Sequence, residues 1–469
     1  MKKTPPGLEG RPDVTGVGSF RTACGFDARC ECAFFLPSTE TTKIWVLVRT
    51  PSGSNGPVVL DWKFSCELTA GTDRFAAEEI FHWGYIEWDW GDGPEDTLVG
   101  DATRLIVRRG EAEEFPILHA RFVITPSALL RSADILTEQG GEVVSGRVVR
   151  AGPLCRASPG VTFQFASAYR RNSSGKVESS VACELLEPAA MADPRMVLAS
   201  LDDVLTLASL AERRISILTG WRVEHANGVS VTSYQRDFTA PSKEETDVDQ
   251  TLISLQYIEE FLNRSIETLA GLPHPGALKQ AIQFALHGQG RGIGDSFVML
   301  FAGIETLLNM FVSGEDIEPI VPKGQWGAWC DTMAAALQAR EDFRALPDEI
   351  QTRLLRNVRS ANRAFFADRF QRMCSSQGID VADLWPMLGG PASLYAVRNR
   401  IVHGRVFSTD QEWFRVVSAK YHLLWTLERS ILRILEWGIE RSRVSQQALR
   451  LLTLYSDWQR DRDHIATTK

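Results

Sequence analysis

Residues 239–250 read TAPSKEETDVDQ, and the character of the sequence changes on either side of this polar stretch. Before it, short runs rich in Val, Ile, Phe and Trp are separated by Gly, Pro, Ser and Asn, a pattern typical of β-strands joined by turns. After it, apolar residues recur at the spacing of amphipathic helices. The sequence therefore predicts an α+β protein of two domains, β-rich over residues 1–240 and all-α over residues 241–469.

The first domain is expected to be sandwich-like, because many short strands at regular spacing are typical of a sandwich or a distorted barrel. Residues 196–219 then follow a helical pattern, and residues 221–238 are expected to form a hairpin that turns at 226–228. The expected strands cover residues 31–36, 43–49, 58–68, 104–108, 117–124, 142–149, 161–169 and 177–186.

The second domain is expected to be a helical bundle whose facing helices build a site. Gly, Pro or polar breaks separate the helices. They are expected at residues 250–271, 276–288, 295–312, 325–339, 346–373, 381–387, 393–403 and 410–456.

The charge balance argues against a generally basic nucleic-acid coat, since 51 basic residues face 59 acidic ones and the net charge is −8. A local basic site remains compatible with this balance. Ten of the 51 basic residues are Lys and the other 41 are Arg. Arginine suits phosphate binding, so the excess favours an anionic ligand, although a genome that prefers Arg codons gives the same excess.

No apolar stretch follows the N-terminal lysines, so the sequence predicts no signal peptide. No window of 18 uninterrupted apolar residues predicts a membrane span. The eight cysteines are scattered, and the cluster Cys24, Cys30 and Cys32 lacks the paired spacing of a zinc site. We therefore expect a cytoplasmic protein with reduced thiols, no cofactor and no metal.

The stretch Pro391–Gly404 reads PASLYAVRNRIVHG and predicts a short helix with defined ends. Pro391 and Ser393 suit the start of a helix, and Gly404 suits its end. Three apolar residues at helical spacing are expected to face the core: Leu394, Val397 and Ile401. Three polar residues occupy the rest of the surface: Arg398, Asn399 and His403.

This motif resembles the Arg-x4–6-His motif of HEPN ribonucleases, including the Asn that often follows the Arg. Residues 295–309, DSFVMLFAGIETLLN, resemble the earlier HEPN helix that carries an acidic residue in an apolar run, here Glu305. A β-rich domain before a C-terminal HEPN domain is similar to the ApeA group of bacterial anti-phage abortive-infection proteins. The resemblance covers about residues 240–469, and for residues 1–240 it rests on the arrangement alone.

The resemblance implies a metal-independent endoribonuclease, with tRNA as a candidate substrate, acting in abortive infection. It implies a homodimer with the active site at the dimer interface. It places Arg398, Asn399, His403 and Glu305 in that site. The first domain is then a sensing or regulatory domain, restraining the nuclease until a phage-derived trigger binds.

The same chemistry follows from the residue types. RNA cleavage without metal needs a base for the 2′-OH, an acid for the leaving 5′-oxygen and a cation for the phosphate. His403 can serve as acid or base near neutral pH, and Arg398 can stabilise the phosphate. At about 100° per residue, these two side chains lie about 140° apart, whereas Asn399 and His403 share a face. A C2 pair of such helices would gather both sets around one cleft.

Glu305 lies between Ile304, Leu307 and Leu308 in sequence, where an unpaired carboxylate is expensive to bury. We expect it to pair with a cation, first of all Arg398. Two roles stay open for Glu305: a part of the active site, or a structural ion pair within the bundle.

A basic stripe is expected in the segment 353–372, because Arg356, Arg359 and Arg363 follow helical spacing. Together with Arg400 they are predicted to bind the RNA backbone. The alternative is a solvated helix face with internal ion pairs. The aromatic and acidic stretch 82–93 is expected to be a strand with inward Trp residues or, alternatively, a partner-binding surface.

Two other functions remain open on the sequence alone. The chain could be a non-catalytic, HEPN-like helical scaffold that binds RNA or a protein through the same patch, since fold does not imply function. It could also be a carbohydrate-binding sandwich with a helical oligomerisation domain, which assigns no role to His403.

Overall fold

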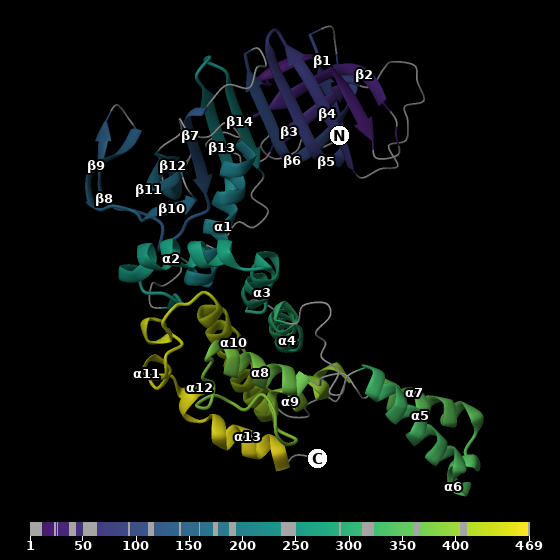
Figure 1. Cartoon of the computed structure of the whole chain (residues 1–469). Coiled ribbons are helices and arrows are strands. Elements are labelled where there is room, and N and C mark those ends of the chain that lie inside the picture. The colour runs from purple at the N-terminus through teal and green to yellow at the C-terminus, as the bar shows by residue number, and fades with distance from the viewer. Residues whose placement is uncertain are drawn as a thin grey trace. The chain divides into compact units, whose positions relative to one another are not determined.

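The computed structural model describes residues 12–22, 25, 27–36, 44–49, 63–91, 94–110, 117–139, 142–158, 160–171, 177–186, 194–235, 250–289, 292–311, 323–360, 366–403 and 410–467. A β-rich N-terminal region is followed by a helical C-terminal region, so the expected α+β class is confirmed (Figure 1). The chain divides into two compact units, Met1–Glu267 and Thr268–Lys469.

The first six strands close into an antiparallel barrel. They pair in the order β6-β3-β2-β1-β4-β5, and β5 pairs back with β6. Large apolar side chains such as Phe34, Val46 and Phe64 fill the interior. The strands are β1 (Val14–Thr22), β2 (Asp27–Phe35), β3 (Ile44–Arg49), β4 (Lys63–Ala70), β5 (Asp73–Asp89) and β6 (Pro94–Arg109).

Of the two arrangements that the strand pattern predicted, a sandwich or a distorted barrel, the structure shows a barrel, and the long strand β6 is the reason. Along one edge β6 pairs with β5 over nearly its whole length. Along the other edge its first half pairs with β3 and its second half with β14 (Ser230–Gln235). β6 thus closes the barrel and also joins it by hydrogen bonds to an open sheet. In a sandwich, the strands would instead form two separate sheets packed face to face.

The open sheet extends the barrel to twelve strands in one hydrogen-bonded order. The predicted hairpin is confirmed, with Gly228 at φ +83° in its turn, a conformation that glycine adopts without strain. Two further strands form a separate hairpin. The added strands are β13 (Leu218–His225), β7 (Ile117–Ile124), β12 (Val177–Leu185), β11 (Val161–Arg171) and β10 (Leu154–Ser158); the hairpin is β8 (Ala133–Gln139) with β9 (Glu142–Arg150).

Helix α1 (Pro194–Glu212) belongs to the first unit and ends in a buried carboxylate. Glu212 accepts hydrogen bonds from the Ser127 hydroxyl and from the Ala128 N–H, the latter at 2.9 Å. Burial raises the pKa of Glu212, while the hydrogen bond from Ser127 opposes the increase. The carboxylate therefore fastens the loop after β7 to the end of α1.

The first unit extends past the predicted boundary at residue 240, because the chain after residue 250 packs back onto it. The N–H groups of Leu252 and Ile253 donate to the Ala211 carbonyl at 2.8 and 3.2 Å. On α2 (Ile258–Gly271), Asn263 donates to the Leu154 carbonyl at 2.8 Å. The first half of α2 thus belongs to the β-rich unit.

The second unit is built around α4 and α10, whose apolar side chains are largely buried. By length and composition alone, α4 could cross a membrane, and half of it is buried inside the protein. The helices of this unit are α3 (Pro275–His287), α4 (Ile293–Met310), α5 (Lys323–Ala339), α6 (Glu341–Arg344), α7 (Asp348–Ser360), α8 (Phe366–Gln377), α9 (Leu394–Val402), α10 (Asp410–Ile434), α11 (Gln446–Leu449), α12 (Thr453–Ser456) and α13 (Trp458–Thr467).

Several helix predictions differ from the structure. The predicted helical stretch 196–219 ends at Glu212, and in the predicted helix 250–271 the α-helix begins at Ile258. Residues 381–387 form turns instead of a helix. The predicted helix 410–456 ends at Ile434, where Glu436 adopts φ +54° and breaks the helical path. The predicted helix 346–373 corresponds to α7 and α8, and residues 361–365 between them lie outside the described part of the chain.

Candidate active site

Helix α9 has the ends that its sequence predicts. The Ser393 hydroxyl accepts a hydrogen bond from the Ala396 N–H at 3.2 Å, which caps the first turn. At the other end, the His403 N–H donates to the Asn399 carbonyl at 3.0 Å, and His403 leaves the helical conformation. Gly404 lies outside the described residues. His403 therefore stands at the C-terminus of α9, where its side chain is exposed.

The loop that leads into α9 is held by backbone and indole hydrogen bonds. The Trp385 indole donates to the Ala392 carbonyl at 2.7 Å. The Leu394 and Tyr395 N–H groups donate to the Pro386 and Met387 carbonyls at 3.0 and 3.1 Å. The first turn of α9 is thus tied to the loop that begins at Trp385.

His422 on α10 fastens this loop to the bundle core. Its Nδ1 accepts a hydrogen bond from the Trp385 N–H at 3.1 Å, so the ring proton lies on Nε2, which donates to the Leu454 carbonyl at 3.2 Å. Burial lowers the pKa of His422 to about 4. The imidazole is therefore neutral near pH 7, and its two hydrogen bonds hold the Trp385 loop and the chain at Leu454 to α10.

An ion pair next to His422 completes this support. Arg429 donates to both carboxylate oxygens of Asp383, at 2.5 and 2.9 Å, and the Tyr455 hydroxyl donates to the same carboxylate at 2.8 Å. Burial alone would raise the pKa of Asp383, but the hydrogen bonds and charge of Arg429 hold it below its usual value. The sequence analysis missed this network, since Asp383 and Arg429 are 46 residues apart.

Aromatic rings pack α9 against α4 and α8. Tyr395 stacks on Phe366 with ring centroids 5.2 Å apart, and Phe301 lies 6.3 Å from Tyr395. Near the other end of α9, a Cβ added to Gly294 would lie 3.6 Å from the Ile401 side chain. On α4, Gly294 lies beside Ile401 of α9, and Phe301 lies beside Tyr395 of α9. The residue numbers rise along α4 while they fall along α9, so the two helices run antiparallel.

Within the motif, the structure brings Arg398 and Asn399 together. The Arg398 guanidinium is half-buried and donates from Nη1 to Asn399 Oδ1 at 3.1 Å. Its Nε is buried and has no hydrogen-bond partner among the described residues. A buried N–H of this kind is costly to leave unpaired.

The expected pairing of Glu305 with Arg398 is not formed. Glu305 is exposed, while its neighbours Ile304 and Leu307 are buried. Phe301 on α4 lies beside Tyr395 on α9. Glu305 is four residues further along α4, and Arg398 is three residues further along α9. Because the two helices are antiparallel, these steps lead in opposite directions. At 1.5 Å per residue, the two positions are separated by about 10 Å along the helices.

Two other polar residues of α4 lie near neighbouring helices. Arg369 of α8 donates to the Asn309 side chain, one turn beyond Glu305 on α4. Asp295, exposed in the first turn of α4, follows Gly294 and so lies at the end of α4 nearest to Ile401. Which residues of α4 and α9 lie side by side depends on the antiparallel register of the two helices, and no local sequence pattern predicts that register.

The predicted RNA-binding arginines have different positions. Arg400 donates to the Ile465 carbonyl at 3.3 Å and so joins α9 to α13. Arg356 and Arg359 belong to α7, although their side chains are outside the described residues, as is all of Arg363. Binding of RNA by these four residues stays a prediction.

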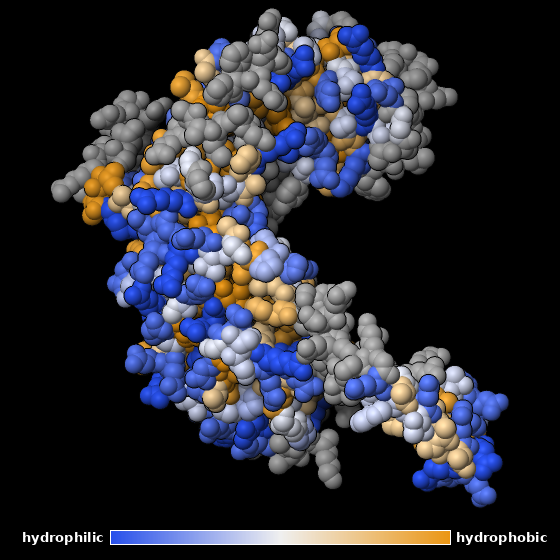
Figure 2. Space-filling view, viewed as in Figure 1, coloured by the Kyte–Doolittle hydropathy of each residue, from blue (hydrophilic) through white to orange (hydrophobic). Residues whose placement is uncertain are grey.

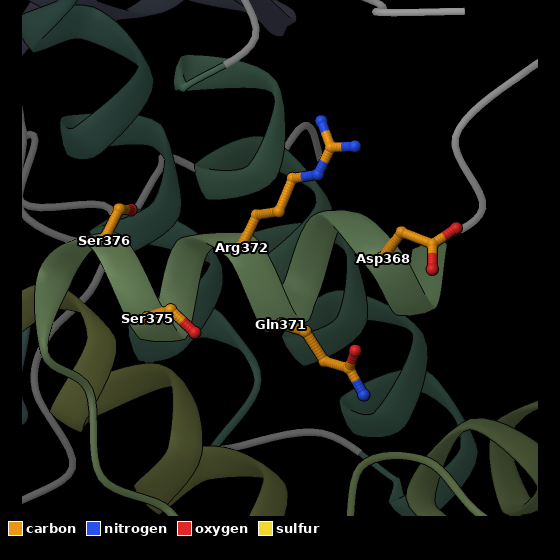
Figure 3. Close-up of a pocket in the computed structure, with 5 residues that line it drawn as sticks. All are labelled: Asp368, Gln371, Arg372, Ser375 and Ser376. Carbon is orange, nitrogen blue, oxygen red and sulfur yellow. The ribbon is translucent and has the colours of Figure 1, made fainter. Parts of the chain in front are cut away.

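An open hollow lies along α8 (Figure 3). Spacings of three and four residues place its lining side chains on one side of the helix. None of them belongs to the predicted site. The hollow is lined by Asp368, Gln371, Arg372, Ser375 and Ser376.

Across the described parts of the chain, no group of three or more His, Cys, Asp or Glu side chains is arranged to hold a metal ion. No protein-family model matches this chain, and neither a curated protein nor a solved structure matches it.

Proposed function

We propose that the chain is a HEPN-type, metal-independent endoribonuclease that cleaves RNA in bacterial anti-phage defence by abortive infection. One observation carries the proposal. An exposed histidine ends α9, and on the same helix the half-buried Arg398 guanidinium donates a hydrogen bond to Asn399. The C-terminal half of α9 thus carries the residue types that RNA cleavage needs, which supports the proposal.

In the proposed reaction, His403 exchanges a proton with the reacting RNA, as base for the 2′-OH or acid for the 5′-oxygen. Arg398 binds the scissile phosphate and stabilises the charge that develops in the transition state. Asn399 positions the guanidinium. The nucleophile belongs to the substrate, so the products carry a 2′,3′-cyclic phosphate and a 5′-hydroxyl.

A single α9 separates Arg398 and His403 by about 140° around the helix. The proposal therefore includes a homodimer in which two α9 helices supply the acid, the base and two cations to one cleft. Glu305 is exposed and can reach a partner or the RNA, so its catalytic role is retained within the proposal.

The β-rich unit is proposed to sense a phage-derived trigger and to restrain the nuclease, because an unregulated ribonuclease would harm its host. Arg356, Arg359, Arg363 and Arg400 are proposed to contact the RNA backbone. Transfer RNA is the first candidate substrate, in line with the resemblance to HEPN toxins.

The direct test incubates the purified chain with total tRNA and with mRNA in EDTA, and repeats the assay with lysate of phage-infected cells to supply a trigger. Cleavage that leaves cyclic-phosphate ends supports the proposal. No cleavage under either condition, together with RNA binding, favours the non-catalytic scaffold. Cleavage that EDTA abolishes contradicts the proposed chemistry.

A further inference from the structure

Helices α5, α6 and α7 form a hairpin with a very small core. α6 lies at the turn between the longer helices α5 and α7, which run antiparallel (Figure 1). Among the described side chains of the hairpin, Cys330 and Phe343 are the apolar ones that are buried. Such a core is too small to stabilise three helices well by itself.

The same hairpin exposes large apolar side chains. Trp329 is 57% exposed, Met333 36%, Ile350 45% and Leu354 40%. We call these four residues the arm face. Figure 2 shows apolar side chains gathered between hydrophilic ones over this hairpin. Apolar residues clustered in this way indicate an interaction surface.

The two pairs of the arm face lie on one side of the hairpin. On α5, the direction of buried Cys330 is the reference, and the helix is viewed from its own N-terminus. Trp329 is then rotated counterclockwise by about 100° and Met333 by about 60°. On α7, Gln351 and Leu355 are half-buried. Ile350 and Leu354 directly precede them and are therefore rotated counterclockwise by about 100°, viewed from the N-terminus of α7. Because the helices are antiparallel, an equal sense of rotation directs both pairs to the same face.

We propose that the arm face binds the arm face of a second copy of this chain, and that the two hairpins form an intermolecular four-helix bundle. A face of two helices, one of them 17 residues long, measures about 25 by 20 Å. Face-to-face pairing would complete the missing core of both hairpins. The contact does not involve α9, which carries Arg398, Asn399 and His403.

The charge pattern of α7 fits a second copy in antiparallel orientation. The helix opens with Asp348 and Glu349 and continues with Arg353, Arg356 and Arg359. When two α7 helices pair antiparallel across a twofold axis, the acidic first turn of one meets the basic second half of the other. The sequence of α7 is thus complementary to itself.

These observations favour a protein partner over RNA at the hairpin, and for Arg356 and Arg359 this contact would replace the contact with RNA proposed above. The arginines of α7 alone would suit a phosphate backbone, but Trp329, Met333, Ile350 and Leu354 offer four exposed apolar side chains with no charge to attract one. Binding of RNA to the hairpin is therefore an alternative outcome of the test.

The test is light scattering after size-exclusion chromatography of the full chain over a wide concentration range. The wild type is expected to dimerise, and Trp329→Glu with Ile350→Glu to weaken dimerisation by about tenfold or more. Leu451→Glu is the matched control, since Leu451 is 87% exposed outside the hairpin. Far-UV circular dichroism checks that each variant is folded.

A charge-swap series keeps the test decisive if the apolar variants misfold. Glu349→Arg alone and Arg356→Glu alone are each expected to weaken the dimer, and the double variant to restore it. The two residues are seven positions apart on one helix, so restoration requires contact between copies. A monomeric wild type, a dimer that all variants leave intact, or variants that reduce only RNA affinity would each overturn the proposal.

Discussion

The Trp385 N–H donates to Nδ1 of His422 at 3.1 Å, and this bond couples the loop before α9 to the core helix α10. Only a neutral imidazole can accept it, because both ring nitrogens of a protonated histidine are donors. The support of the candidate site is therefore sensitive to acid.

We predict that the protein loses stability as the pH falls from about 6.5 to about 4. Burial lowers the pKa of His422 to about 4, so over this window the unfolded chain binds a proton that the folded chain excludes. The loss amounts to about 3 kcal/mol, and thermal unfolding across this range measures it. In His422→Gln the pH dependence should flatten; an unchanged slope would mean that another group causes it.

A second prediction concerns the ion pair beside His422. Asp383→Asn leaves the buried Arg429 without its counter-charge, because Arg429 is 3% exposed. We expect a loss of about 3–5 kcal/mol in the free energy of unfolding, measured with denaturant. The control is Asp342→Asn, which breaks a pair exposed to solvent and should leave stability nearly unchanged. Equal effects of the two variants would be inconsistent with a structural role of Asp383.

A third prediction tests the barrel. A Cβ at Gly18 of β1 would overlap the Glu67 carbonyl on β4, whereas a Cβ at Gly84 of β5 would meet no atom within 4 Å. Gly18→Ala is expected to cost about 1–3 kcal/mol, and Gly84→Ala much less. Thermal unfolding of both variants compares them. If Gly18→Ala were as stable as wild type, β1 and β4 could not lie as close as the barrel requires.

Local patterns were enough to predict much of the fold. The apolar run at 117–124 coincides with β7, and the ends of α9 follow from Ser393 and the residues near His403. Strand β1 was missed because Gly16 and Gly18 weaken its strand pattern, although close approach of β4 requires Gly18. Closure of the barrel depends on long-range pairing of β5 with β6, which no local pattern encodes.

The candidate site was predictable where it depends on one helix and not where it depends on several. Arg398 and Asn399 are neighbours on α9, and the structure brings their side chains together. The position of Glu305 relative to Arg398 depends on the antiparallel register of α4 and α9. The burial expected for Glu305 from its apolar neighbours was wrong because it points away from the buried face of α4.

The account depends most directly on His403, and the decisive measurement is the rate of RNA cleavage in EDTA by the wild type and by His403→Ala. The control is His287→Ala, because His287 is also exposed in the last turn of a helix, α3. We predict that His403→Ala lowers the rate by about 10²–10⁴-fold and that His287→Ala leaves it unchanged. Equal rates in the wild type and both variants would contradict the proposed active site.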